Sequence, residues 1–219
     1  FKSPYGIKTD RTNQYVADSE NQRIRKIVIS TGVVTTLAGS SQGSTDATGT
    51  SARFYQPYGI TTDGTNLYVA DTNNHRIRKI VISTGVVTTL AGQSDNGSTD
   101  ATGTSASFNF PSGITSDGTN LYVADTSNHR IRKIVISSGV VTTLAGSSLG
   151  FLDNTTGTSA KFNYPYGITT DGTNLYVADH VNDRSRKIGI STGAVTTLAG
   201  KSFKFTDASG TSARLKHQK

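Results

Sequence analysis

One motif, Tyr-Val-Ala-Asp, recurs four times and constrains the fold more than any other feature of the chain. Successive copies are separated by 53, 54 and 54 residues and begin at Tyr15, Tyr68, Tyr122 and Tyr176. The prolines keep the same intervals, and the chain has no others: Pro4, Pro57, Pro111 and Pro165. Self-similarity at a fixed period is the signature of a repeat architecture, in which one ring or solenoid can take up the whole chain.

Four short runs in the second copy are rich in β-branched and aromatic residues, as strands are. They cover residues 59–62, 66–70, 76–82 and 86–91. Asp63-Gly64 can supply the positive φ of a tight hairpin between the first two runs. No stretch shows the 3.6-residue apolar period of an amphipathic helix. We therefore predict an all-β fold, a β-propeller of four-stranded antiparallel blades.

The repeat boundaries predict a single propeller or propeller segment over residues 1–219. The predicted blades are approximately 1–53, 54–107, 108–161 and 162–214. A blade cannot bury both of its faces alone, so neighbouring blades must stack. Because Phe1 is in register with Phe54, the chain holds whole units without a split blade. We expect these four blades to be part of a larger ring; closure as four blades, or several chains in one ring, are the alternatives.

Three segments of the second copy carry a resemblance to a known family. Residues 57–60 read Pro-Tyr-Gly-Ile, residues 67–71 read Leu-Tyr-Val-Ala-Asp, and residues 74–80 read Asn-His-Arg-Ile-Arg-Lys-Ile. Together they resemble the NHL repeat, and the long connection 92–111 resembles the extended form found in bacterial and cell-surface members. The resemblance implies a propeller but leaves its function open, because propellers host unrelated activities.

Three functions are compatible with that resemblance. The first is a non-catalytic NHL propeller, extracellular or surface-associated, that serves as a protein or glycan interaction module or as a scaffold. The second is binding of single-stranded RNA, for which some NHL propellers of developmental regulators are the precedent. The third is a fragment of a propeller lyase or hydrolase.

A basic set, Arg-x-Arg-Lys, recurs in every copy and supplies 12 of the 22 basic residues in a chain of net charge +7. In a ring it would form a repeated positive belt that could contact phosphates or sulfated glycans. The candidate binding residues of this belt are Arg25, Arg78, Arg132 and Arg186. The competing interpretation pairs these arginines with repeated aspartates such as Asp71 and Asp63, which would join one blade to the next.

The loop-rich face of the propeller is the second candidate. In a four-stranded meander, the second-to-third connection and the long blade-to-blade connection share one face, and long connections are often functional. Its candidate residues are Asn73, Asn74, His75, Asn128, His129, Asp100 and Asp153. We expect the histidines to stabilise turns and the aspartates to form Asx turns. Calcium bound by the loop aspartates is an alternative, and no other metal or cofactor is expected.

The remaining composition narrows the function further. The absence of cysteine excludes disulfides and Cys nucleophiles. An active site needs polar residues that occur once, whereas almost every polar residue here is repeated, so we do not expect an enzyme. No apolar run is long enough to cross a bilayer, so no membrane insertion is expected. The expected partners are a protein or glycan, or further copies of the chain, at an extracellular or cell-surface location; nucleic acid is the alternative partner.

Overall fold

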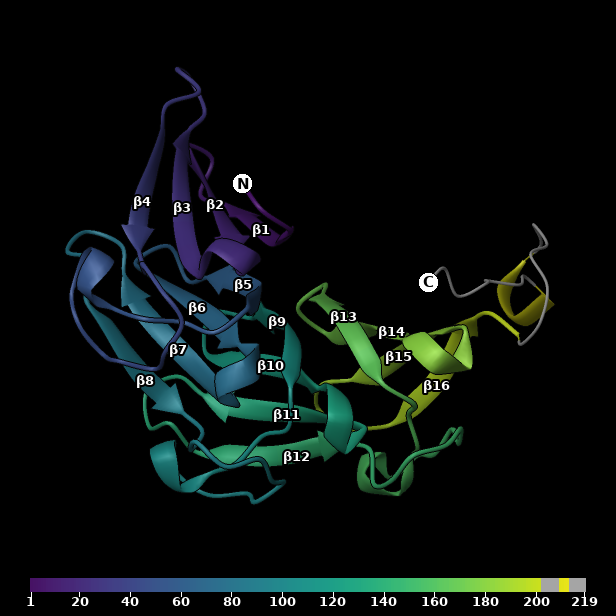
Figure 1. Ribbon diagram of the computed structural model, residues 1–219. Helices are drawn as coiled ribbons and strands as arrows, with labels where there is room; N and C mark the ends of the chain where they lie inside the picture. Colours follow the sequence, from purple (N-terminus) through teal and green to yellow (C-terminus); the bar gives the residue numbers. More distant parts are fainter. Residues whose placement is uncertain (202–208, 213–219) are drawn as a thin grey trace.

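The computed structural model describes residues 1–201 and 209–212, and its four antiparallel sheets confirm the predicted all-β propeller fold (Figure 1). Blade 1 holds β1 (Pro4–Thr9), β2 (Asn13–Asp18), β3 (Arg23–Val28) and β4 (Val34–Ala38). Blade 2 holds β5 (Pro57–Thr62), β6 (Asn66–Asp71), β7 (Arg76–Val81) and β8 (Val87–Ala91). Blade 3 holds β9 (Pro111–Ser116), β10 (Asn120–Asp125), β11 (Arg130–Val135) and β12 (Val141–Ala145). Blade 4 holds β13 (Pro165–Thr170), β14 (Asn174–Asp179), β15 (Arg184–Gly189) and β16 (Val195–Ala199).

Single turns of 3-10 helix punctuate the connections, and the described residues contain no longer helix. One set joins the second and third strands of each blade: η1 (Ser19–Asn21), η3 (Thr72–Asn74), η5 (Thr126–Asn128) and η7 (His180–Asn182). The other set lies in the long connections: η2 (Gly49–Ser51), η4 (Gly103–Ser105), η6 (Gly157–Ser159) and η8 (Gly210–Ser212). The first strand of each blade lies innermost and the fourth outermost (Figure 1).

Each inner strand carries a β-bulge directly after its proline. In blade 2, Pro57 pairs with Asp71 and Ile60 pairs with Val69, so that two residues oppose the single residue between them on β6. The same shift occurs in the other three blades. The second bulged residue is a glycine for a steric reason: a side chain on Gly59 would collide with the carbonyl oxygen of the next blade. The bulge therefore sets how closely neighbouring inner strands approach.

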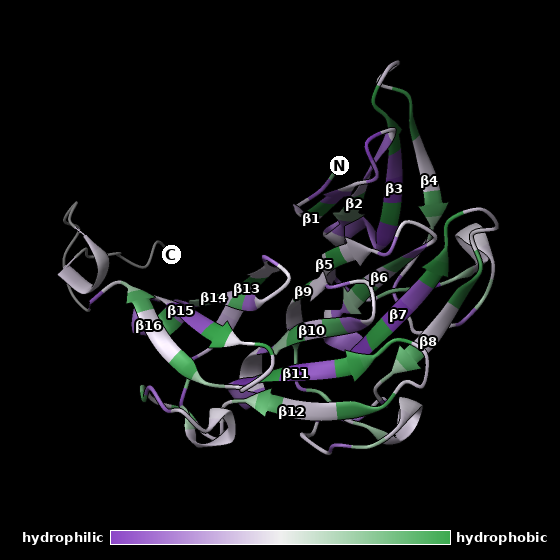
Figure 2. Cartoon of the chain, turned by 180° about the vertical axis from the view of Figure 1, so that it is seen from behind, coloured by the Kyte–Doolittle hydropathy of each residue, from purple (hydrophilic) through white to green (hydrophobic). Residues whose placement is uncertain are grey.

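The hydrophobic core lies between the blades rather than within one of them. At the joint of blades 2 and 3, four residues of blade 2 are fully buried: Tyr68, Ala70, Ile77 and Ala91. They pack against the facing side of blade 3, with Leu121, Val123, Ile134 and Val141. Phe108, from the connection, lies in the same cluster. Both faces of an inner blade are therefore covered, and apolar segments alternate with polar ones along β7 and β11 (Figure 2).

The four blades form an open arc with blade 1 and blade 4 at its ends (Figure 1). Ile7 on the end face of blade 1 is 60% exposed, whereas its counterparts Ile60 and Ile114 are 5% and 6% exposed. Each end face also carries a polar replacement: Gln14 stands where Leu67 lies in blade 2, and Ser185 stands where Ile77 lies. The departures from the repeat thus fall on faces that lack a neighbouring blade in this arc.

Candidate binding site at the channel mouth

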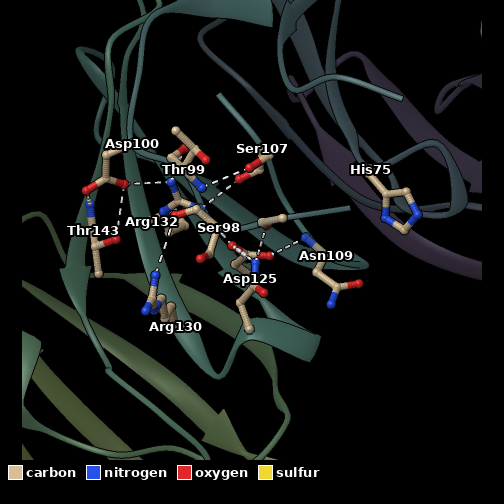
Figure 3. A network of polar contacts seen from close by, with 12 residues as sticks. His75, Ser98, Thr99, Asp100, Ser107, Asn109, Asp125, Arg130, Arg132 and Thr143 are labelled. Carbon is tan, nitrogen blue, oxygen red and sulfur yellow. Dashed lines mark hydrogen bonds and ion pairs between the residues drawn. The ribbon is translucent and has the colours of Figure 1, made fainter. Parts of the chain in front are cut away.

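The guanidinium group of Arg132 is the centre of a buried polar network between blades 2 and 3 (Figure 3). Nη1 donates hydrogen bonds to Asp125 at 2.8 Å and to the carbonyl of Ser107 at 2.9 Å. Nη2 donates to Asp100 at 2.6 Å and to the carbonyl of Thr99 at 2.9 Å. Burial raises the pKa of Asp125, and the positive charge of Arg132 opposes that shift. One arginine therefore joins a strand carboxylate to a carboxylate of the incoming connection.

The same clamp recurs at the other two joints. Arg78 pairs with Asp71 and Asp46, and Arg186 pairs with Asp179 and Asp153. The expected pairing of these arginines with repeated aspartates is thus confirmed for Asp71, but Arg78 and Asp71 lie in the same blade, and Asp46 makes the contact with the connection from blade 1. The pairing is wrong for Asp63, which instead accepts a hydrogen bond from the hydroxyl of Tyr68 at 2.7 Å.

The prediction of a solvent-exposed belt is wrong for three of the four candidate arginines. Arg78, Arg132 and Arg186 have no solvent-exposed area, because each guanidinium is enclosed at a joint and faces two carboxylates. Arg25 in blade 1 differs: its side chain is 21% exposed, and Asp18, 3.5 Å away, is its only ion-pair partner among the described residues. A repeated phosphate-binding surface built from these arginines is therefore absent from the described part of the chain.

The loop-face candidates lie at the same joints. Asn74 donates to the carbonyl of Gly43, and Asn128 donates to the carbonyl of Gly97, so each fixes the preceding connection. Asn73 donates to Gln56. These amides therefore hold neighbouring segments in place.

The aspartates of the long connections do the same. The carboxylate of Asp100 accepts hydrogen bonds from the backbone and hydroxyl of Thr143, and Asp153 does so from Thr197. The expected Asx turn is wrong for these two residues, because their carboxylate oxygens accept hydrogen bonds from the outer strand of the following blade and not from their own loop. No group of three His, Asp or Glu side chains within 1–201 and 209–212 is placed to hold a metal ion.

The two histidines stabilise a turn, as expected, and also a joint. His75 and His129 both adopt a left-handed backbone with φ of 56°. Nδ1 of His75 accepts a hydrogen bond from the backbone N–H of Phe110 at 3.2 Å, and that of His129 accepts one from Tyr164 at 3.1 Å. Each imidazole also contacts the following aromatic ring edge-on. Burial lowers the pKa of both imidazoles, so the neutral acceptor form is favoured.

A cluster of tyrosines lies between the inner strands β1, β5, β9 and β13, a place that we call the channel mouth, and it was not predicted from the sequence. The first bulged residue, directly after each proline, is Tyr5, Tyr58, Ser112 or Tyr166. Ring centroids of Tyr5 and Tyr58 are 4.3 Å apart, and those of Tyr58 and Tyr166 are 6.3 Å apart. With the Gly-Ile pairs that follow them, these residues line a hollow of about 230 Å³. The available signal was tyrosine after proline in three of four copies.

Titratable groups lie beside this tyrosine cluster but do not line it: besides burial, the charge of Glu20 contributes to the raised pKa of Tyr58, and the ring of His180 lies 5.8 Å from that of Tyr166. None of the residues that line the hollow carries a charged side chain. Burial raises the pKa of Tyr58 and of Tyr166, so both phenols stay protonated and can donate and accept hydrogen bonds. Ser112 is buried, and its hydroxyl donates a hydrogen bond to the carbonyl of Tyr166 at 3.0 Å. No helix in the described segments is long and apolar enough to cross a membrane.

Comparison with known proteins identifies the repeat. The NHL repeat model matches residues 54–80 and 108–134. The human protein "NHL repeat-containing protein 2" is 37% identical over 143 residues, which cover 59% of this chain and 20% of that protein. This chain therefore matches only a minor part of its curated relatives' length.

Solved structures share the fold. An auxiliary nutrient binding protein from Bacteroides thetaiotaomicron superposes with a TM-score of 0.66 at 20% identity, over 84% of this chain and 45% of that one. A catalytically inactive virginiamycin B lyase from Staphylococcus aureus, solved with quinupristin, gives 0.59 at 19% identity, over 90% and 55%. At these identities the likeness is one of fold.

Proposed function

Because this chain carries NHL repeats on propeller blades, we propose that it is a non-catalytic binding module, extracellular or surface-associated, with its ligand site at the tyrosine cluster. The observation that carries the proposal is the convergence of Tyr5, Tyr58 and Tyr166 at the mouth of the channel. Concave, largely apolar hollows with a few polar groups are the usual form of ligand sites.

The bulge tyrosines are more exposed than the second-strand tyrosines of blades 1, 2 and 3, and Tyr58 and Tyr166 are half-buried. The strand tyrosines Tyr15, Tyr68 and Tyr122 are fully buried, whereas Tyr5 is 56% exposed. The blade joints do not require tyrosine at the bulge, since Ser112 occupies it in blade 3 with its joints intact. Aromatic rings that the fold does not need, gathered in a hollow, favour a role in recognition.

The contacts of the other candidates favour binding over catalysis. The repeated arginines and aspartates are used in the joints, and the repeated histidines accept backbone hydrogen bonds. The nutrient binding protein supports a binding role by analogy of fold, while the lyase with the same fold represents the enzymatic alternative. The burial of Arg78, Arg132 and Arg186 weakens the case for RNA, because these three arginines do not face the solvent.

The proposal is tested by a ligand screen against the tyrosine cluster. Ligand-observed NMR would be run with oligosaccharides, peptides and homopolymeric RNA against the native chain and a Tyr58→Ala, Tyr166→Ala double variant. We expect at least one ligand class to bind the native chain and to be lost in the variant. The matched control is Tyr164→Ala, because Tyr164 is also exposed but lies against His129 outside the hollow. Ligands that bind both chains equally would contradict the assignment of the site.

A further inference from the structure

We infer that the outer edge of blade 1 binds an extended acidic segment of a separate protein, through the contacts that the connections of this chain make at its three joints. The edge consists of residues 32–36, along β4, and the guanidinium group of Arg25. It lies apart from the tyrosine cluster and is a second binding site beyond the proposed function.

The connection between blades 1 and 2 shows the backbone contacts of such a segment. Residues 45–49, Thr-Asp-Ala-Thr-Gly, run antiparallel to the outer strand of blade 2. The backbone N–H of Val87 donates to the carbonyl of Ala47 at 2.8 Å, and the backbone N–H of Gly49 donates to the carbonyl of Gly85 at 2.8 Å. The segment thus extends the sheet of blade 2, which is how extended peptides add to an open sheet edge.

A buried cation anchors the same segment through its aspartate. Nη2 of Arg78 donates to the carboxylate of Asp46 at 2.6 Å and to the carbonyl of Thr45 at 3.1 Å. The second carboxylate oxygen of Asp46 accepts the backbone N–H of Thr89 at 2.9 Å. Hydrogen bonds between charged groups are roughly twice as strong as neutral ones. The aspartate therefore fixes the position of the segment along the outer strand.

The other two joints show which of these contacts are constant. The N–H of Val141 donates to the carbonyl of Ala101, and the N–H of Val195 donates to the carbonyl of Asn154, both at 2.8 Å. Each of these two residues directly follows the aspartate that pairs with the buried arginine. Since that residue is alanine in one joint and asparagine in the other, recognition depends on the backbone and on one carboxylate.

Blade 1 presents the same edge to solvent. The register of β4 on β3 is that of β8 on β7, so the N–H groups of Val34 and Thr36 point outward as those of Val87 and Thr89 do. No residue within 1–201 and 209–212 pairs with this edge, and β4 is the outermost strand of its sheet (Figure 1). Val34 is 39% exposed, whereas Val87 is 1% exposed.

The space beside the edge is open as well. A Cβ built on Gly85 would lie 3.6 Å from the backbone nitrogen of Gly49, because the connection passes there. A Cβ on the equivalent Gly32 would meet nothing within 4 Å. An extended segment can therefore reach the edge of blade 1 without displacing any described part of the chain.

The charged anchor of blade 1 is already in place. The guanidinium group of Arg25 lies over the ring of Phe1 at 5.5 Å, as that of Arg78 lies over Phe54 at 5.1 Å. Nη1 of Arg25 contacts Asp18 at 3.5 Å, and Nη2 donates no hydrogen bond to any residue that the structure describes. A carboxylate from a ligand would complete the arrangement found at the three joints.

The chain's own described copies of the segment are not available to this edge. They lie at residues 45–49, 99–103 and 152–155, and each is bound at a joint. We therefore assign the edge to a separate protein with an exposed, extended segment that carries one aspartate. Residues 206–210, Thr-Asp-Ala-Ser-Gly, lie partly outside the described residues and make a second copy of the chain the competing occupant.

The test uses a synthetic peptide of residues 43–52, labelled with fluorescein and titrated with the native chain by fluorescence anisotropy. We expect saturable binding, and we expect the Asp46→Asn peptide to bind about tenfold more weakly because a charge-assisted hydrogen bond is lost. Arg25→Met in the chain should cause a similar loss. Lys26→Met is the matched control: it removes the same charge from the neighbouring residue, whose side chain points to the opposite face of β3, and should leave binding unchanged.

A second variant tests the backbone contact. Val34→Pro removes the outward N–H that would donate to the peptide, and proline is tolerated on an edge strand where its nitrogen faces solvent. We expect this variant to fold, as far-ultraviolet circular dichroism would show, and to bind the peptide at least about tenfold more weakly.

The outcomes distinguish this site from the tyrosine cluster. No peptide binding by the native chain, or equal binding by the Arg25→Met and Lys26→Met chains, overturns the inference. The Tyr58→Ala, Tyr166→Ala double variant should bind the peptide as the native chain does; loss of binding there assigns the peptide to the tyrosine cluster, which overturns the inference and leaves the proposed function standing. Self-association in sedimentation velocity that Arg25→Met abolishes assigns the edge to a second copy and overturns the choice of a separate protein.

Discussion

Replacing Arg132 with methionine is expected to lower the free energy of unfolding by about 3–5 kcal/mol. The substitution keeps an apolar stem of similar length beside Phe108, over whose ring the guanidinium lies at 5.1 Å. It removes the only cation that pairs with Asp125 among the described residues, and Asp125 is a carboxylate with no exposed area. Asp100, whose side chain is 44% exposed, can be hydrated instead, so the buried partner accounts for most of the loss.

A matched variant in blade 1 gives the control. The guanidinium of Arg25 is partly exposed and lies 3.5 Å from its single carboxylate, so Arg25→Met is expected to lower stability by about 1 kcal/mol or less. The double variant Arg132→Met, Asp125→Asn should recover part of the loss, because the amide needs no counter-charge. The two arginine variants share one chemical change and differ in burial and in the number of paired carboxylates.

The assay is urea unfolding followed by far-ultraviolet circular dichroism and by tyrosine fluorescence, which is usable because the chain has no tryptophan. A lower midpoint with an unchanged slope would mean that stability changed without altering the surface exposed on unfolding. The reasoning is refuted if Arg132→Met loses no more than Arg25→Met, or if Asp125→Asn in the same chain lowers stability further.

Two further predictions follow from the joints. Burial lowers the pKa of His75 and His129, so these side chains take up protons at a higher pH in the unfolded chain than in the folded chain. The two histidines therefore contribute fully to stability above the ordinary histidine pKa of 6.5, and their contribution falls as the pH drops below that value. The urea midpoint should therefore fall from pH 8 to pH 5. Replacing both histidines with glutamine should make the midpoint less dependent on pH, because Gln22 accepts the equivalent backbone hydrogen bond in blade 1 without titrating. Gly113→Ala should strongly destabilise the chain, because a Cβ there collides with the carbonyl of the next blade, whereas Gly167→Ala, with its nearest contact at 3.8 Å, should leave the melting temperature within about 2 °C. Equal melting temperatures for the two alanine variants would contradict the proposed close approach.

The repeat made the blade predictable, but not which polar groups face inward. The strands of blade 2 were expected at 66–70 and 76–82 and are found at Asn66–Asp71 and Arg76–Val81. The burial of Arg78 was harder to predict. Alternating side chains along a strand point to opposite faces of the sheet, and this pattern distinguishes buried from exposed residues only when one of the two faces is in contact with solvent. Both faces of an inner blade are covered, so a strand position alone does not indicate whether a charge is exposed. The aspartate that recurs in every connection was the available signal.

The tyrosine cluster could not be predicted for a different reason. The position after the proline varies between tyrosine and serine, and its direction depends on the bulge, which places two residues where a regular strand would have one. A one-residue change of register reverses the face of a side chain. The direction of Tyr58 therefore follows from the bulge and could not be predicted from the alternation of side chains along a regular strand.

The bulge also makes recognition modular. Each blade contributes the first residue of its bulge to the channel mouth, whereas the buried core and the arginine clamps of the joints are formed by other residues. The order around the axis, Tyr-Tyr-Ser-Tyr, is therefore a separate variable from the stability of the arc. Exchanging the residues at 58 and 112 would change the order of side chains at the channel mouth and leave the arginine clamps of the joints in place. Duplication of such a blade multiplies binding positions, and single substitutions at this one place can then give related chains different ligands.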